Sequence, residues 1–189
     1  VLADCKSEFA RKALNDKIKE QQEKRRQVNN ELHRLIKQDE YMLRKMHLLM
    51  QEIGVGKETA TALVLEFPEL GHLSRKEVAS LVGVAPFNYD SGNKIGKRFT
   101  RFGRRHIRSL LYMCVRAALN AKSENIYHKR WEQLERKKKK PDLLTGNPED
   151  KDYTRRMVAC MRLMIVRLNA ITRDWINEGC PSPIQKKRG

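Results

Sequence analysis

The chain has 189 residues and a formal net charge of +17 at pH 7, from 40 lysines and arginines against 23 aspartates and glutamates. A charge of this size favours a polyanionic partner, and nucleic acid is the first candidate. No stretch approaches the roughly 20 apolar residues that a membrane-spanning helix needs, and the beginning of the sequence has no apolar run of the signal-peptide kind. We therefore expect no membrane association and a cytoplasmic, nucleoid-associated protein.

The cysteines and histidines show no spacing typical of a metal site or a disulfide framework. The four cysteines lie far apart, at Cys5, Cys114, Cys160 and Cys180, and no CxxC pair occurs. We expect them to be reduced, with Cys114 and Cys160 as core residues. The sequence predicts no metal site in this chain.

Residues 7–51 contain no proline or glycine and are dense in Lys, Glu, Gln and Arg. Apolar residues follow a heptad seam through Leu14, Ile18, Val28, Leu32, Leu35, Met42, Met46 and Leu49, interrupted by Gln21, Arg25 and Asp39. The pattern predicts one long coiled-coil helix within residues 1–51, which needs a partner helix. Because the stripe is long and narrow, self-association into a dimer or tetramer is favoured over packing within the chain.

The stretch Ile53-Gly54-Val55-Gly56-Lys57 separates two helical patterns and is typical of a helix-hairpin-helix. Glycines allow the tight turn, and the N–H groups that open the second helix can bind a phosphate. We therefore predict nucleic-acid contacts at Gly54, Gly56 and Lys57. An ordinary corner with a glycine cap predicts the same residues, and the pattern alone does not separate the two.

The remaining patterns predict a compact helical domain over residues 52–178 and a disordered basic tail over 179–189, so the fold class is all-α. Ser74 and Glu77 form a capping box for a helix that runs to about Val82. Further helices are expected from about Gly103, from Ser123 and from Tyr153 to Glu178, with a loop from Pro141 to Asp152. The acidic residues of that loop adjoin in sequence and favour capping and solubility over metal binding.

A basic loop joins the helix ending near Val82 to the helix starting near Gly103. We predict that its cations and those that follow bind nucleic acid: Lys94, Lys97, Arg98, Arg101, Arg104, Arg105 and Arg108. Ser91-Gly92 lies in the same loop. A serine there could attack a phosphodiester while the cations neutralise the developing charge.

Spacing alone favours a turn over a nucleophile at Ser91-Gly92, because both residues suit turn geometry. Asp90 could act as a base, but an Asx turn is favoured for the same reason. From the residues by themselves, the sequence indicates a basic helical nucleic-acid binder with an irregular serine loop.

The order of coiled-coil helix, glycine hairpin, Ser-Gly loop and arginine helix resembles the C-terminal half of the Piv-invertase-like insertion-sequence transposases. The resemblance covers roughly Glu20 to Asp174 and is carried by Ile53 to Ala62 and Gly83 to Tyr112. It implies a DNA transposase or site-specific recombinase of an insertion sequence, in which the catalytic residue Ser91 forms a covalent phosphoserine–DNA intermediate. In that family a structured bridge RNA guides recombination in the members studied that way. Arg98 and Arg101 match the basic positions after the serine.

The resemblance also implies a RuvC-like half whose four acidic residues bind a divalent metal, Mg²⁺, and none of these carries over to a residue of this chain. We expect that half to lie upstream of Val1, so that this chain alone binds nucleic acid but does not recombine. The implied partners are DNA, a structured guide RNA and further copies of the chain. The alternative is a non-catalytic helix-hairpin-helix binding and dimerisation module in which Ser91 only shapes a turn. A basic RNA-binding scaffold is a third possibility.

Overall fold

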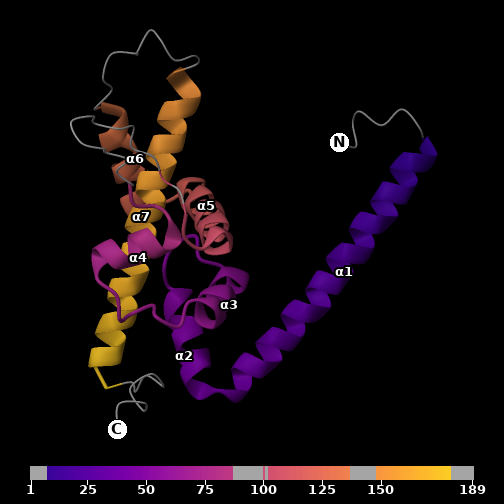
Figure 1. Ribbon diagram of the computed structural model, residues 1–189, viewed down its shortest axis with the longest axis horizontal. Coiled ribbons are helices and arrows are strands. Elements are labelled where there is room, and N and C mark those ends of the chain that lie inside the picture. The colour runs from indigo at the N-terminus through magenta and orange to yellow at the C-terminus, as the bar shows by residue number, and fades with distance from the viewer. Residues whose placement is uncertain (1–7, 87–99, 101, 137–147, 180–189) are drawn as a thin grey trace, which may run out of the picture. The chain divides into compact units, whose positions relative to one another are not determined.

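The structure is a computed structural model and describes residues 8–86, 100, 102–136 and 148–179 (Figure 1). Within these ranges the chain forms seven helices and no strand, which confirms the predicted all-α class. The chain divides into two compact units, residues 1–43 and residues 44–189. No helix of the described part is long and apolar enough to cross a membrane.

The first unit contains the expected long N-terminal helix, α1 (Glu8–Gln38). Ion pairs one turn apart support its polar surface, for example Lys24 with Glu20 at 2.5 Å and Arg34 with Glu31 at 2.7 Å. The predicted seam is largely exposed in a single chain, at Leu14, Ile18, Val28 and Leu35. The helix α1 is therefore amphipathic, and its apolar stripe is exposed in the single chain.

The helix does not continue to Gln51 as the heptad pattern suggested, because it is interrupted at Asp39. The Asp39 carboxylate accepts a hydrogen bond from the Met42 N–H at 3.0 Å, and its carbonyl accepts one from Leu43 at 2.9 Å. An aspartate that bonds to the third residue of a new helix acts as an N-cap. The second helix, α2 (Glu40–Leu49), therefore starts directly after it.

The second unit is built around the long helix α7 (Pro148–Asn177), which contacts α4 (Arg75–Val82), α5 (Arg105–Leu119) and α6 (Ile126–Arg136) (Figure 1). The helix α3 (Lys57–Glu66) packs against α5. One face of α7 is buried, at Met157, Cys160, Met161, Met164, Ile165 and Leu168. The α5 face that meets it and α3 is buried at Ile107, Leu111, Cys114, Val115 and Ala118.

The capping box of α4 is present as predicted. The Ser74 hydroxyl accepts from the Glu77 N–H, and the Glu77 carboxylate accepts from the Ser74 N–H at 2.8 Å. This pair fixes the start of the helix, and Gly83 ends it in the left-handed conformation.

Two of the expected helix starts are displaced. The helix α6 begins at Ile126 and not at Ser123, because the Asn125 side chain caps it by accepting from the Tyr127 N–H at 2.9 Å. The helix α7 begins at Pro148, so residues 148–152 are helical and not part of the preceding loop. Proline suits the first position of a helix, where its missing N–H has no partner to lose.

Candidate nucleic-acid interface

The first turn of α5 concentrates positive charge at the positive end of the helix dipole. Arg104 is its N-cap residue, Arg105, His106 and Arg108 follow, and the turn contains no acidic residue. Cations at this end of a helix oppose the dipole and weaken the helix, by about 0.3–1 kcal/mol each at an exposed site. The same arrangement suits an external anion, which would meet the positive end of the dipole and the side-chain cations together.

Two of these side chains are held by carboxylates of the segment that ends α3. The Arg104 guanidinium forms a bidentate pair with Glu69, at 2.6 and 2.9 Å, and donates to the Glu66 carbonyl at 2.6 Å. It also lies over the Phe67 ring, 4.8 Å from its centroid. The Arg104 hydrogen bonds hold the pKa of Glu69 below its usual value. His106 Nδ1 lies 2.8 Å from Glu66 Oε2.

Arg105 and Arg108 form no pair with a carboxylate in the described part of the chain. Arg105 is exposed, whereas the Arg108 guanidinium donates to the Phe102 carbonyl at 2.7 Å. Of the predicted binding residues in α5, Arg105 therefore presents its charge to solvent, and Arg104 and Arg108 have structural contacts as well.

The two ends of the serine loop meet at Gly83 and Gly103. Both glycines have a positive φ, of 76° and 75°, and a Cβ on Gly103 would lie 2.5 Å from the Gly83 nitrogen. The Arg104 N–H donates to the Leu81 carbonyl at 2.9 Å across the same junction. Backbone contacts this close leave no room for a side chain, so both positions require glycine. The two glycines thereby allow the end of α4 to pack against the start of α5. The segment containing Ser91 therefore leaves and returns at the basic turn.

The glycine hairpin lies between α2 and α3, and its two glycines have different surroundings. Gly54 has a φ of +85°, and a Cβ there would collide with the Cys114 carbonyl of α5. Gly56 has nothing within 4 Å of its Cβ position and caps α3 without a side-chain hydrogen bond. Gly54 thus allows close packing on α5, while Gly56 and the exposed Lys57 leave the N-terminus of α3 open.

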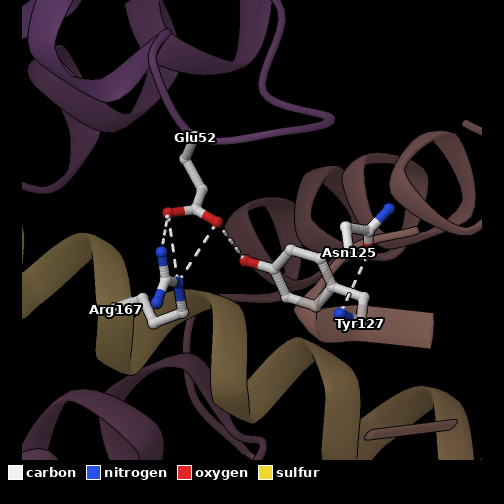
Figure 2. A network of polar contacts seen from close by, with 4 residues as sticks. All are labelled: Glu52, Asn125, Tyr127 and Arg167. Atoms are coloured by element: carbon white, nitrogen blue, oxygen red, sulfur yellow. Dashed lines mark hydrogen bonds and ion pairs between the residues drawn. The ribbon is translucent and has the colours of Figure 1, made fainter. Parts of the chain in front are cut away.

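A buried network holds the same hairpin from its other side (Figure 2). The Glu52 carboxylate, 5% exposed, pairs with the Arg167 guanidinium of α7 at 3.1–3.2 Å and accepts a hydrogen bond from the Tyr127 hydroxyl of α6 at 2.7 Å. Burial and the neighbouring carboxylate raise the pKa of Tyr127, so that its hydroxyl stays a donor. All three members have partners, which is the condition for a buried charge to be tolerated.

The two described cysteines are core residues, as predicted, and are not disulfide-bonded. Burial raises the pKa of the Cys160 thiol to about 11 and also raises that of Cys114, whose Sγ lies 3.4 Å from the Thr59 hydroxyl. The thiolate is the reactive form of cysteine, so neither residue is set up as a nucleophile.

Several of the predicted site residues lie outside the described residues: Ser91, Lys94, Lys97, Arg98 and Arg101. In the described ranges no group of three His, Cys, Asp or Glu side chains is placed to hold a metal ion.

Sequence reasoning missed the acidic partners of the basic turn and the Glu52 network. Glu69 and Arg104 are 35 residues apart, and Glu52 and Arg167 are 115 apart, so no local spacing connects them. It also missed Phe102, which adopts a positive φ of 68° with its side chain exposed. The adjacent Gly103 was the available signal of an unusual turn.

Comparison with known protein families supports a transposase. Residues 46–130 match the family described as Transposase IS116/IS110/IS902 family. The matched range runs from α2 through the hairpin and the basic turn into α6, and covers somewhat less than half of the chain. No curated protein matches the chain. The match supports a transposase or recombinase that acts on DNA and derives from an insertion sequence.

Proposed function

We propose that this chain is the serine-bearing part of an insertion-sequence recombinase, and that Ser91 attacks a phosphodiester of DNA. The main support is the family match over residues 46–130, which contains both the Ser91-Gly92 motif and the basic turn of α5. The junction of Gly83 with Gly103 adds to it, because the serine segment begins and ends beside the N-terminus of α5. A scissile phosphate bound at that helix end would lie close to both ends of the serine segment.

The proposed reaction is a transesterification. The Ser91 Oγ forms a bond to phosphorus and loses its proton to a base or to water, while the bond from phosphorus to one strand oxygen breaks and that oxygen takes up a proton. The phosphoserine keeps the free energy of the broken phosphodiester. Attack by a strand hydroxyl then restores a phosphodiester and releases the serine, without an external energy source. The cations stabilise charge on the non-bridging oxygens in both steps.

A covalent trap tests this function. The chain, expressed within its full reading frame, is incubated with a nicked suicide duplex, and the adduct is sought by gel shift after denaturation and located by peptide mass spectrometry. We expect an adduct at Ser91 that Ser91→Ala abolishes. Ser109→Ala is the matched control, since the Ser109 hydroxyl is exposed on α5 and bonds to the Arg105 carbonyl of its own helix. An adduct of equal yield in Ser91→Ala would refute the proposal.

The open N-terminus of α3 supports the second candidate, a non-catalytic binding module. Gly56 and Lys57 are exposed there and Gly56 leaves room for a close approach. A backbone phosphate bound at this site would give affinity without base specificity. Under this hypothesis the affinity for DNA is unchanged by Ser91→Ala and no covalent species forms, so the same trap separates the two functions.

The partners proposed with this function are DNA, a structured guide RNA and a second copy of the chain. The exposed apolar stripe of α1 supports the last, because four large side chains are 39–59% exposed on one helix. Sedimentation of the chain should show a dimer or tetramer, and Ile18→Glu with Val28→Glu should convert it to a monomer. An unchanged assembly in the double variant would exclude this helix as the contact. We also propose a cytoplasmic, nucleoid-associated location, in keeping with DNA as the substrate.

A further inference from the structure

The apolar stripe of α1 is interrupted near its middle by two polar residues, Gln21 and Arg25. Leu14 and Ile18 lie before the interruption and Val28 lies after it, and all three side chains are exposed in the single chain. A shallow groove of about 310 Å³ follows the first half of the stripe, from Leu14 to Arg25. The order apolar, polar, apolar along the stripe restricts how a second copy of the helix can align with it.

A parallel pair of these helices would bring like charges together. Two copies related by a two-fold axis are then in register, so that each residue of the seam faces the same residue of the partner. Arg25 would face the partner's Arg25. Arg11, which has the heptad position of Ile18 one repeat earlier, would face the partner's Arg11. Like charges held together in a contact oppose association, so the seam disfavours this orientation.

An antiparallel pair centred between Gln21 and Arg25 matches the stripe to itself. In this orientation the first seam position of each heptad faces the second seam position of the partner's heptad. The facing pairs are Leu14 with the partner's Leu32, Ile18 with the partner's Val28, and Arg25 with the partner's Gln21. A shift of one heptad in either direction instead places Arg25 against the partner's Val28 or the partner's Leu14. Apolar residues meet apolar residues, and Arg25 meets an amide, in the centred alignment.

The charges beside the stripe fit the same alignment. Lys17 and Glu31 each lie directly before a seam residue, and an antiparallel pair brings these flanking positions of the two copies together. Lys17 then faces the partner's Glu31 at both ends of the contact. Lys24 faces its own copy at the centre, but each Lys24 already pairs with Glu20 of its own helix. In a parallel pair Lys17 would meet the partner's Gln22 and no opposite charge. Exposed pairs of this kind select an orientation more than they add stability.

We propose that two copies of this chain pair through α1 in antiparallel orientation, with Ile18 packed on the partner's Val28. This inference deepens the self-association included in the proposed function and rests on it. The occupant of the exposed stripe is a second copy of the same helix, in one orientation and one register. The C-terminal ends of the two α1 helices then lie at opposite ends of the contact.

Disulfide formation between introduced cysteines tests the orientation in the full chain. Cys5→Ser and Cys180→Ser first remove the two cysteines outside the described residues, while the two described cysteines are buried. Ile18→Cys and Val28→Cys are then made in separate chains, which are mixed under reducing conditions and oxidised. We expect a covalent dimer with one chain of each kind, because the antiparallel pair brings these two positions close enough for a disulfide. Peptide mass spectrometry should locate the bond between positions 18 and 28.

The single variants and a shifted pair are the controls. Ile18→Cys or Val28→Cys alone should give no covalent dimer, because the two copies of either residue lie about 15 Å apart along an antiparallel pair. Ile18→Cys mixed with Leu35→Cys tests the alignment shifted by one heptad and should also give no covalent dimer. All three positions belong to the exposed seam, so differences in accessibility do not account for the expected pattern.

Each other outcome overturns the proposal in a different way. Crosslinking of Ile18→Cys with itself would show a parallel pair, and preferential crosslinking with Leu35→Cys would show another register. A chain that sediments as a dimer but forms no covalent dimer in any combination would exclude α1 as the contact, and a monomer would reject the self-association as well. Since these assays need no DNA, a failed Ser91 trap with the expected crosslink would reject the proposed reaction and leave the helix pairing standing.

Discussion

The glycine hairpin and the first turn of α5 carry the same kind of sequence signal, a helix N-terminus beside basic side chains. In the hairpin, Gly54 is pressed against α5 and Glu52 is tied to α6 and α7, while the first turn of α3 contains the acidic Glu58. The first turn of α5 has no acidic residue, and its exposed Arg105 has no carboxylate partner in the described part. The hairpin is fixed mainly by internal contacts, whereas the first turn of α5 leaves the charge of Arg105 available.

The difference indicates which signals report packing and which report binding. A glycine with a positive φ and a close backbone neighbour is explained by the fold itself, as at Gly54 and Gly83. An exposed cation at the positive end of a helix dipole with no carboxylate partner in the described ranges, as at Arg105, is not explained by the fold, since it lowers helix stability. We therefore expect substitutions in the hairpin to act mainly on stability, and substitution of Arg105 in the basic turn to act mainly on affinity for nucleic acid.

Gly54→Ala should have the largest effect. The alanine would have to keep the left-handed φ of Gly54. Its Cβ would also collide with the Cys114 carbonyl of α5, which cannot move independently of its helix. We expect the free energy of unfolding to fall by about 3–4 kcal/mol, measured by urea denaturation followed by circular dichroism. Gly56→Ala is the matched control, with an ordinary φ of −86° and open space, and should cost less than about 1 kcal/mol. An equal loss of unfolding free energy in the two variants would show that close packing on α5 does not set Gly54 apart from Gly56.

Glu52→Gln should have the next largest effect. The amide keeps the shape of the carboxylate but removes the charge that Arg167 and the Tyr127 hydroxyl bind. Because Arg167 is 40% exposed and can turn toward water, we expect a loss of about 2 kcal/mol, less than for a fully buried pair. Glu31→Gln, which breaks the exposed pair with Arg34, should leave the unfolding curve unchanged within error. A Glu52→Gln variant as stable as the wild type would show that the network adds no net stability.

Sequence patterns predicted the helices of the second unit well because each is specified locally. The apolar period of α7 and the Ser74–Glu77 capping box need only neighbouring residues to be recognised. The break at Asp39 was also local, but the apolar seam resumes directly after it at Met42, Met46 and Leu49, and this concealed the N-cap. The contacts that separate the hairpin from the basic turn could not be predicted. Glu52 meets Arg167 and Glu69 meets Arg104 only after the helices have packed.

A pH titration should detect the buried amine of Lys45. Lys45 of α2 is buried, donates to the Leu70 carbonyl at 3.2 Å and is attracted by Glu69, and burial lowers its pKa from 10.5 to about 8. Between these values the unfolded chain binds more protons than the folded one, so the free energy of unfolding rises with pH. We expect a rise of about 1–2 kcal/mol from pH 7.5 to 9.5. The rise should be absent in Lys45→Met, and a wild-type curve parallel to that of the variant would contradict the buried amine.

Arg105→Ala should change stability least and binding most specifically. Its side chain is exposed and has no carboxylate partner in the described ranges, and it opposes the helix dipole, so its removal should raise the free energy of unfolding by only about 0.3–1 kcal/mol. If Arg105 neutralises one phosphate, the slope of log affinity against log salt concentration should become shallower by about 1, measured by fluorescence anisotropy on duplex DNA. Lys57→Ala should change the slope less, because the neighbouring Glu58 opposes an anion at the start of α3. A larger change for Lys57 than for Arg105 would reverse the comparison and move the principal phosphate contact to the glycine hairpin.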